Sequence, residues 1–273
     1  MKRNQVNARM VAGFWGKDLK EPNNWYAMNV VGDTAEIRIY DIIGWPFVDA
    51  DTFLNELSNI QQNKILVRIN SPGGDVFDGM AIYNALKDHP AQITTRIEGI
   101  AASMASIIAL AGDADKRQIA KSASYMIHNP WSFYGGDYRE AEKAADLMKR
   151  LAAQLAEIYA DATGAKQADI QALMDSETWF FGKEAVESSF MSNVSDKGAA
   201  QTAKFDLSMF AHAPKSTEPT KRDLERTLTQ DAGLSRSQAR QLLHGGFESL
   251  ATQDASDDKA VSAVQNLLNT IKG

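Results

Sequence analysis

The strongest constraint on this chain is an alternation of strand-like and helix-like runs between residues 25 and 120. Residues 35–40 and 64–70 have the apolar, β-rich composition of strands. Residues 50–60 and 75–89 instead carry apolar side chains at helical spacing. Two strands joined through a helix form a βαβ unit, and repeated units build a mainly parallel sheet. The sequence therefore predicts an α/β fold whose chemistry lies near strand ends.

The same pattern continues into the middle of the chain. Residues 93–97 and 124–128 read as further strands, and the small-residue run 101–111 between them suits a buried helix. Asp137 follows two glycines and predicts the N-cap of a long helix that extends to residue 160. Apolar side chains recur every four residues along this helix, at Leu147, Leu151, Leu155 and Tyr159. This stripe predicts packing within the subunit or between subunits.

Composition divides the chain into four parts. Residues 25–197 form the domain with the alternating pattern, and residues 1–24 precede it as an N-terminal segment. Residues 198–220 are rich in Ala, Ser, Thr and Pro without clear periodicity, which predicts a linker. Residues 221–273 return to helical patterns and predict a small helical tail.

Three helices are expected in the tail, at residues 222–232, 235–243 and 256–271. The first two can be read as a simple hairpin or as a helix-turn-helix that directs Arg236 and Arg240 toward DNA. Two helices around a Gly turn are more often a hairpin, and the basic patch is small. We therefore expect a tail that makes scaffolding or assembly contacts and binds no nucleic acid.

Composition also excludes several classes of function. The chain has no cysteine, which rules out disulfide scaffolds, thiolate metal sites and cysteine nucleophiles. Its 29 Lys and Arg against 35 Asp and Glu give a net charge of −6, which argues against bulk affinity for nucleic acid. The longest apolar stretch, residues 101–112, is shorter than the roughly 20 residues of a membrane span. We expect a cytoplasmic protein without membrane contact.

Motifs for nucleotides and metals are absent from the sequence. It contains no G-x-x-x-x-G-K-[ST], no G-x-G-x-x-G and no H-E-x-x-H, and its four histidines are scattered. The sequence therefore predicts neither a cofactor nor a metal site.

Two segments at predicted strand ends contain candidate catalytic groups. Residues 69–74, Ile-Asn-Ser-Pro-Gly-Gly, can aim free backbone N–H groups into a cleft, as an oxyanion hole requires. Alone, this segment reads more often as a strand-to-helix turn. Ser103, in the sequence Gly-Ile-Ala-Ala-Ser-Met at residues 99–104, has small neighbours that allow a tight turn and an exposed hydroxyl. A serine in such a run is more often an N-cap or a core hydroxyl.

The third segment is Met-Ile-His-Asn-Pro at residues 126–130, with His128 at the end of an apolar strand. His89 lies at a helix end, His212 in the linker and His244 in the tail, so elimination favours His128. A histidine at a strand end is still more often structural than catalytic. A serine hydroxyl is a poor nucleophile until an imidazole takes its proton, so His128 has to be considered together with Ser103.

Together the three segments resemble the proteolytic subunit of the Clp protease family, over about residues 27–194. The resemblance implies the ClpP/crotonase fold, built from repeated ββα units with a long handle helix. It also implies that Ser103 is the nucleophile and His128 the general base of a serine endopeptidase. The backbone N–H groups of Gly74 and Met104 would then be the oxyanion donors.

The acid of the triad is less defined by the sequence. The stretch Glu-Thr-Trp-Phe-Phe-Gly-Lys-Glu-Ala at residues 177–185 resembles the family's stretch that ends in Glu-Ala. This alignment places Glu177 where the family usually has aspartate. Asp175, two residues earlier, is the open alternative, because a triad is defined by geometry rather than by sequence position.

The segment after residue 197 resembles the C-terminal additions of ClpP-like head-maturation proteases of tailed phages. This resemblance implies a polypeptide substrate, a homo-oligomeric ring, and capsid or scaffold proteins or an unfoldase ring as partners. A phage-encoded protein would act in the host cytoplasm. Residues 1–24 do not match the family clearly, which leaves docking to an unfoldase open.

Other functions compete with this interpretation. The same fold could serve as a non-catalytic assembly or scaffold protein, or carry the acyl-CoA chemistry of the crotonase group. A Ser-Lys dyad with Lys121 is a further alternative, against which the segment at residues 126–130 argues. For the endopeptidase, we expect activity to fall as pH drops through the histidine's pKa, near ~6.5 before environmental shifts.

Overall fold

The computed structural model describes residues 28–44, 47–196, 205, 207, 209–213, 221–230 and 234–245. The chain divides into two compact units, Met1–Ala213 and Pro214–Gly273. The predicted N-terminal segment and the third predicted tail helix, residues 256–271, lie outside the described residues.

The first unit is built on a sheet that has eight strands across the described residues. These are β1 (Met28–Val31), β2 (Thr34–Ile39), β3 (Lys64–Ser71), β4 (Gln92–Ala102), β5 (Arg117–Ala120), β6 (Ser124–Ile127), β7 (Thr178–Phe181) and β8 (Asn193–Ser195). The main order is β1-β2-β3-β4-β5-β8, parallel except for the β1–β2 pair. The sheet forks at β4, which pairs with β5 along Thr95–Ile97 and with β6 along Ile100–Ala102. β7 then pairs with β6 in antiparallel orientation.

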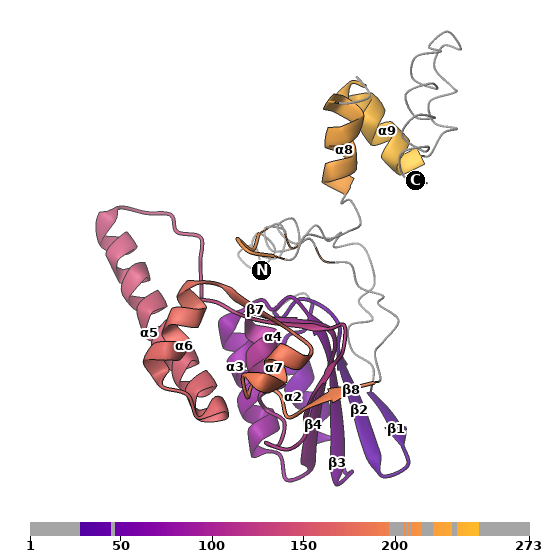
Figure 1. Ribbon diagram of the computed structural model, residues 1–273, viewed down its shortest axis with the longest axis vertical. Helices are drawn as coiled ribbons and strands as arrows, with labels where there is room; N and C mark the ends of the chain where they lie inside the picture. Colours follow the sequence, from indigo (N-terminus) through magenta and orange to yellow (C-terminus); the bar gives the residue numbers. More distant parts are fainter. Residues whose placement is uncertain are drawn as a thin grey trace. The chain divides into compact units, whose positions relative to one another are not determined.

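The helices of this unit pack mainly on one face of the sheet (Figure 1). They are α2 (Ala50–Ser58), α3 (Val76–Asp88), α4 (Met104–Ala109), α5 (Tyr138–Thr163), α6 (Gln167–Asp175) and α7 (Lys183–Glu187). Alternate residues of the parallel strands, such as Ile37, Val67 and Ile97, are fully buried against Phe53 and Ile82 of the helices. Burial of each such side chain stabilises the fold by about 1.5–3 kcal/mol, so this layer supplies the core.

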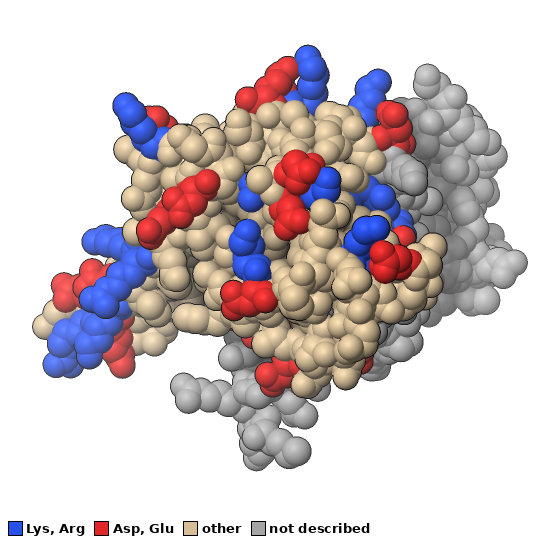
Figure 2. All heavy atoms as spheres, turned by 90° about the horizontal axis from the view of Figure 1, so that it is seen from below, with Lys and Arg blue, Asp and Glu red and all other residues tan. Residues whose placement is uncertain are grey.

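Helix α5 is packed only along its second half. It begins at a capping box in which Asp137 and Glu140 satisfy each other's backbone N–H groups. Its buried residues start at Leu151, whereas Leu147 is 45% exposed, and the first half projects from the body in Figure 1. The face in Figure 2 mixes acidic and basic side chains, including those along the projecting helix, and has no broad area of one sign.

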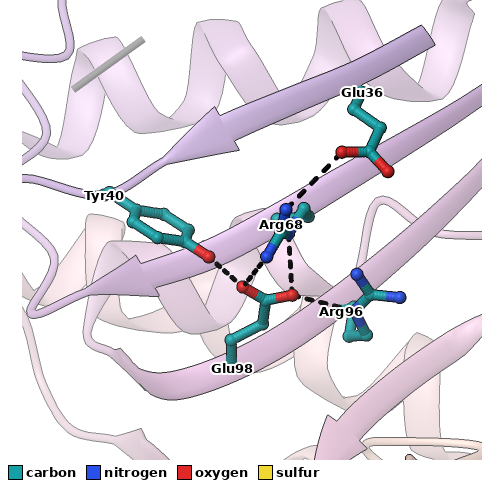
Figure 3. Close-up of polar contacts among 5 residues, drawn as sticks. All are labelled: Glu36, Tyr40, Arg68, Arg96 and Glu98. Carbon is teal, nitrogen blue, oxygen red and sulfur yellow. Dashed lines mark hydrogen bonds and ion pairs between the residues drawn. The ribbon is translucent and has the colours of Figure 1, made fainter. Parts of the chain in front are cut away.

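The opposite face of the sheet carries a network of charged side chains (Figure 3). Arg38, Arg68 and Arg96 stand in register on β2, β3 and β4. The buried carboxylate of Glu98 accepts hydrogen bonds from Arg68 Nε at 2.7 Å and Arg96 Nε at 3.0 Å, and also from the Tyr40 hydroxyl. No local sequence pattern predicts this network, because the arginines are far apart in the chain and only the strand register aligns them.

The predicted α/β fold is confirmed. The four predicted strands and the predicted helices at 50–60, 75–89 and 137–160 all appear within a few residues of the expected ends, except β4, which is much longer. The helix expected over residues 101–111 was wrong at its start, because β4 continues to Ala102 and α4 begins only at Met104.

The second unit contains α8 (Lys221–Gln230) and α9 (Arg236–Gly245) among its described residues. Leu228, Leu234 and Ala239 form a small buried cluster between these helices. Arg240 Nε donates a 3.0 Å hydrogen bond to Glu225 of α8. This ion pair occupies one of the two arginines that the helix-turn-helix alternative would direct toward DNA.

Part of the predicted linker packs on the first unit. Phe210 is 5% exposed and joins a buried cluster with Ile42, Ile100 and Met126, on the face of the sheet opposite the helices. No helix in the described ranges is long and apolar enough to cross a membrane. The described residues also hold no cluster of three or more His, Asp and Glu that could bind a metal.

Candidate active site

Ser103 lies at a sharp turn between β4 and α4. Its backbone has φ 54° and ψ −128°, a region that residues other than glycine rarely adopt. Its N–H donates to the carbonyl of Met126 on β6, at 3.1 Å. Strained conformations of this kind persist where the surrounding structure enforces them, and they occur often at active sites.

A buried chain of hydrogen-bonded hydroxyl groups holds the backbone of this turn. Ser106 Oγ donates to the Ser103 carbonyl at 2.5 Å and lies 2.6 Å from the hydroxyl of Tyr159 on α5. The Tyr125 hydroxyl donates to the Ser106 carbonyl at 3.0 Å. Burial raises the pKa of both tyrosines, so these hydroxyls remain protonated donors. A role for Ser106 was not predicted from the sequence, and Tyr159 was predicted only as part of an apolar stripe.

His128 follows β6 directly, and its Nε2 lies 2.9 Å from Ser103 Oγ. The fork in the sheet produces this contact, because β4 and β6 are adjacent parallel strands that end side by side. Burial lowers the pKa of His128 to about 4, and the Glu177 carboxylate opposes this shift. The imidazole is therefore neutral at pH 7 and can accept a proton from Ser103.

The loop with the paired glycines lies against the serine turn. A Cβ on Gly73 would come within 2.6 Å of Ser103 Cβ and 3.0 Å of the Met104 nitrogen. Gly74 has φ 151°, and a Cβ there would lie 2.0 Å from the Ile43 carbonyl oxygen. Only glycine fits at either position. The two predicted oxyanion donors, at Gly74 and Met104, therefore belong to adjoining backbone segments beside the Ser103 hydroxyl.

Glu177 and Asp175 differ in their relation to His128. β6 and β7 pair in antiparallel register with Ile127 opposite Thr178, so the next position places His128 opposite Glu177. Asp175 instead accepts hydrogen bonds from Asn129 and Gln171, and the bond from Asn129 is the main cause of its lowered pKa. Register and charge thus favour Glu177 as the partner of His128.

Glu177 nevertheless makes its hydrogen bonds elsewhere. Its carboxylate accepts from the backbone N–H of Ala211 at 2.9 Å, from that of His212 at 2.7 Å and from Trp179 Nε1 at 3.3 Å. Within the described part of the chain, no hydrogen bond joins His128 to Glu177. The serine and the histidine are brought together, whereas the acid is held by the segment after the domain.

Phe210 covers the imidazole from the same segment. Its ring meets those of His128 and Trp179 edge to face, with centroid distances of 5.5 and 5.7 Å. The composition of this segment had predicted a linker. The signal that could have revealed it is a group of large apolar residues, Phe205, Leu207, Met209 and Phe210, within a stretch otherwise rich in small and polar residues.

The sequence profile of the Clp protease family matches residues 50–198, more than half of the chain. The chain belongs to the Clp protease family. The matched range contains Gly74, Ser103, His128 and Glu177, and it ends before the segment that contains Phe210.

Individual members of the Clp protease family align over about half of this chain. ATP-dependent Clp protease proteolytic subunit 1 of Leifsonia xyli is 35% identical over 130 residues, which are 48% of this chain and 66% of that protein. Subunit 2 of Tropheryma whipplei is 33% identical over 130 residues, which cover 48% of this chain and 72% of that protein. Subunit 1 of Protochlamydia amoebophila is 36% identical over 132 residues, 48% of this chain and 64% of that protein. The chain thus spans about two thirds of the length of these relatives.

Proposed function

We propose that this chain is a serine endopeptidase in which Ser103 is the nucleophile and His128 the general base. The observation that carries the proposal is the 2.9 Å contact between Ser103 Oγ and His128 Nε2 at a strained turn. A neutral, buried imidazole at that distance can take the hydroxyl proton as the oxygen attacks a peptide carbonyl.

The other groups complete a standard acyl transfer. The backbone N–H groups of Gly74 and Met104 would stabilise the oxyanion, and Glu177 would stabilise the imidazolium that forms on His128. His128 then gives its proton to the leaving amine, and a water molecule hydrolyses the acyl-enzyme. No metal or cofactor is needed for these steps.

The substrate we propose is an extended polypeptide, cleaved within a homo-oligomeric ring. The names of the relatives support a polypeptide substrate, since each is a proteolytic subunit of an ATP-dependent protease. The words ATP-dependent in these names add an unfoldase ring to the partners that we propose.

The biological setting we propose is capsid or scaffold maturation in a phage. The support is the C-terminal addition, because the family match ends at residue 198 and a separate helical unit follows. A maturation protease should cleave a co-expressed scaffold or capsid protein and leave a generic unfolded protein largely intact.

The direct test is labelling of the full chain with a fluorophosphonate probe, followed by peptide mapping. We expect one adduct, on Ser103, that is lost in Ser103→Ala and weakened in His128→Ala. A folded protein without an adduct in any variant would contradict the proposal and favour a non-catalytic scaffold protein. Ser122→Ala is the matched control, because it removes an exposed hydroxyl outside the candidate site.

A further inference from the structure

We infer that the sheet face beside His128 is a peptide-binding site, and that residues 209–213 of the same chain occupy it in cis. The inference rests on the proposed function, because its consequence is restraint of the catalytic acid. Its ligand class is a peptide with a large aromatic side chain followed by two residues that have free backbone N–H groups.

The first observation is a fitted apolar pocket for the aromatic side chain. Phe210 is only 5% exposed, although it lies in a segment without helix or strand. The pocket is lined by side chains from several elements of the domain, namely Ile42, Phe47, Ile100, Ala102, Met126 and Trp179. Such an aromatic anchor in a desolvated pocket is the usual centre of a binding site.

The second observation is recognition of the peptide backbone. The two residues after Phe210 donate their N–H groups to Glu177, one to each carboxylate oxygen, at 2.9 and 2.7 Å. Hydrogen bonds to an ionised acceptor are stronger than neutral ones. They use main-chain atoms, so another peptide with the same spacing can replace the segment.

The third observation is that the domain shared with the family ends before this segment. The family match stops at residue 198, and the segment begins at residue 209. The members of this cluster that belong to the matched domain all precede residue 180, whereas Phe205, Leu207, Met209 and Ala213 join it from the same part of the chain as Phe210. The segment therefore lies outside the part of the chain that matches the family, although it belongs to the same compact unit.

Occupancy has a direct consequence for the triad. His128 and Glu177 are the residues next to the last pair of the β6–β7 ladder, yet the Glu177 carboxylate is engaged by the segment and by Trp179. Phe210 at the same time covers the imidazole ring. Departure of the segment frees the carboxylate to accept from His128 and opens the ring to solvent.

Two full-length variants test this inference through the rate of fluorophosphonate labelling at Ser103. Phe210→Ala removes the anchor, and His212→Pro removes one N–H donor while the aromatic ring remains. A site that is open in only 0.1–10% of molecules labels about tenfold or more faster once it is released. Phe77→Ala is the matched control, because Phe77 is 64% exposed on α3. Unchanged or slower labelling in both folded variants would overturn the inference, since the segment would then only support the acid.

A second measurement does not depend on catalysis. A synthetic peptide with the sequence of residues 207–213 should bind the Phe210→Ala variant in calorimetry and slow its labelling again. The same peptide with proline in place of His212 should bind at least about tenfold more weakly, because it lacks one charge-assisted hydrogen bond. Equal binding of both peptides, or none by either, would overturn the inference. Absence of labelling in every variant would instead contradict the proposed function, while the binding result would still decide this inference.

Discussion

Ser103 and Glu177 both occupy backbone positions with positive φ, 54° and 45°, but different parts of the chain hold them. Ser103 is fixed by buried neighbours in the shared domain, including Met126 and Ser106. Glu177 is fixed by backbone N–H groups from beyond the family match. The nucleophile is therefore part of the core. The environment of the acid comes from outside the family match, so it can be changed separately.

The largest effect on kcat is expected from substitution of the acid, Glu177. Glu177→Gln should lower kcat by about 10³- to 10⁴-fold, because the neutral amide cannot stabilise an imidazolium. Asp175→Asn should change kcat by less than about twofold, since that carboxylate bonds to Asn129 and Gln171. Peptidase assays of both variants, alone and combined with Phe210→Ala, decide between the two acids. A larger loss in Asp175→Asn would reverse the assignment.

The second effect concerns the glycine loop. Gly74→Ala should lower kcat by about 10²-fold or more, because the new methyl group clashes with the Ile43 carbonyl and moves an oxyanion donor. Gly135→Ala is the matched control, as a Cβ there meets nothing within 4 Å. Equal kinetics of the two variants, both with wild-type melting temperatures, would show that the loop does not bind the oxyanion.

A smaller effect is expected from the hydroxyl chain under the serine turn. Tyr159→Phe keeps the ring and removes one buried hydrogen bond, which typically contributes about 1 kcal/mol. If the chain positions Ser103, kcat should fall by about fivefold with little change in KM. A double-mutant cycle with Ser106→Ala should be non-additive, since both changes break one network. Additive losses would mean that Tyr159 contributes to stability alone.

The smallest effect is expected from mild acid. Burial lowers the pKa of His128 to about 4, below its ordinary value of 6.5, so the neutral base persists as pH falls from 7 toward 4. The value of kcat/KM at pH 5.5 should therefore remain above about nine tenths of that at pH 7. The expectation from the sequence used the ordinary histidine pKa of about 6.5 before environmental shifts, and burial moves the expected loss of activity to lower pH. In Phe210→Ala the ring is more exposed, and the acidic limb should move upward in a pH profile.

Much of the site could be predicted from local sequence. Gly74, Ser103 and His128 lie in short segments whose small residues, glycines and strand ends are visible in one dimension, and the structure brings these segments together. The fold class followed from the βαβ alternation. In contrast, the row of Arg38, Arg68 and Arg96 depends on strand register, which local patterns do not specify.

The segment with Phe210 could not be predicted for a related reason. Its composition is that of a linker, and its docking depends on a pocket formed by residues from four distant parts of the chain. Its hydrogen bonds to Glu177 come from the backbone, so side-chain identity gives no signal. Periodicity and motifs report on contacts within elements, not on a short segment bound across the sheet.

The fork in the sheet fixes the backbone spacing of the candidate triad. Ser103 follows β4, His128 follows β6 and Glu177 precedes β7, and these three strands are consecutive neighbours. Neighbouring strands are about 4.8 Å apart, so the strand spacing sets the distances between the backbones of nucleophile, base and acid. The β4–β6 ladder therefore fixes the spacing of the Ser103 and His128 backbones, whereas the contact between Oγ and Nε2 also depends on their side-chain rotamers. The spacing of the pair is as durable as the sheet, and its side-chain contacts remain adjustable.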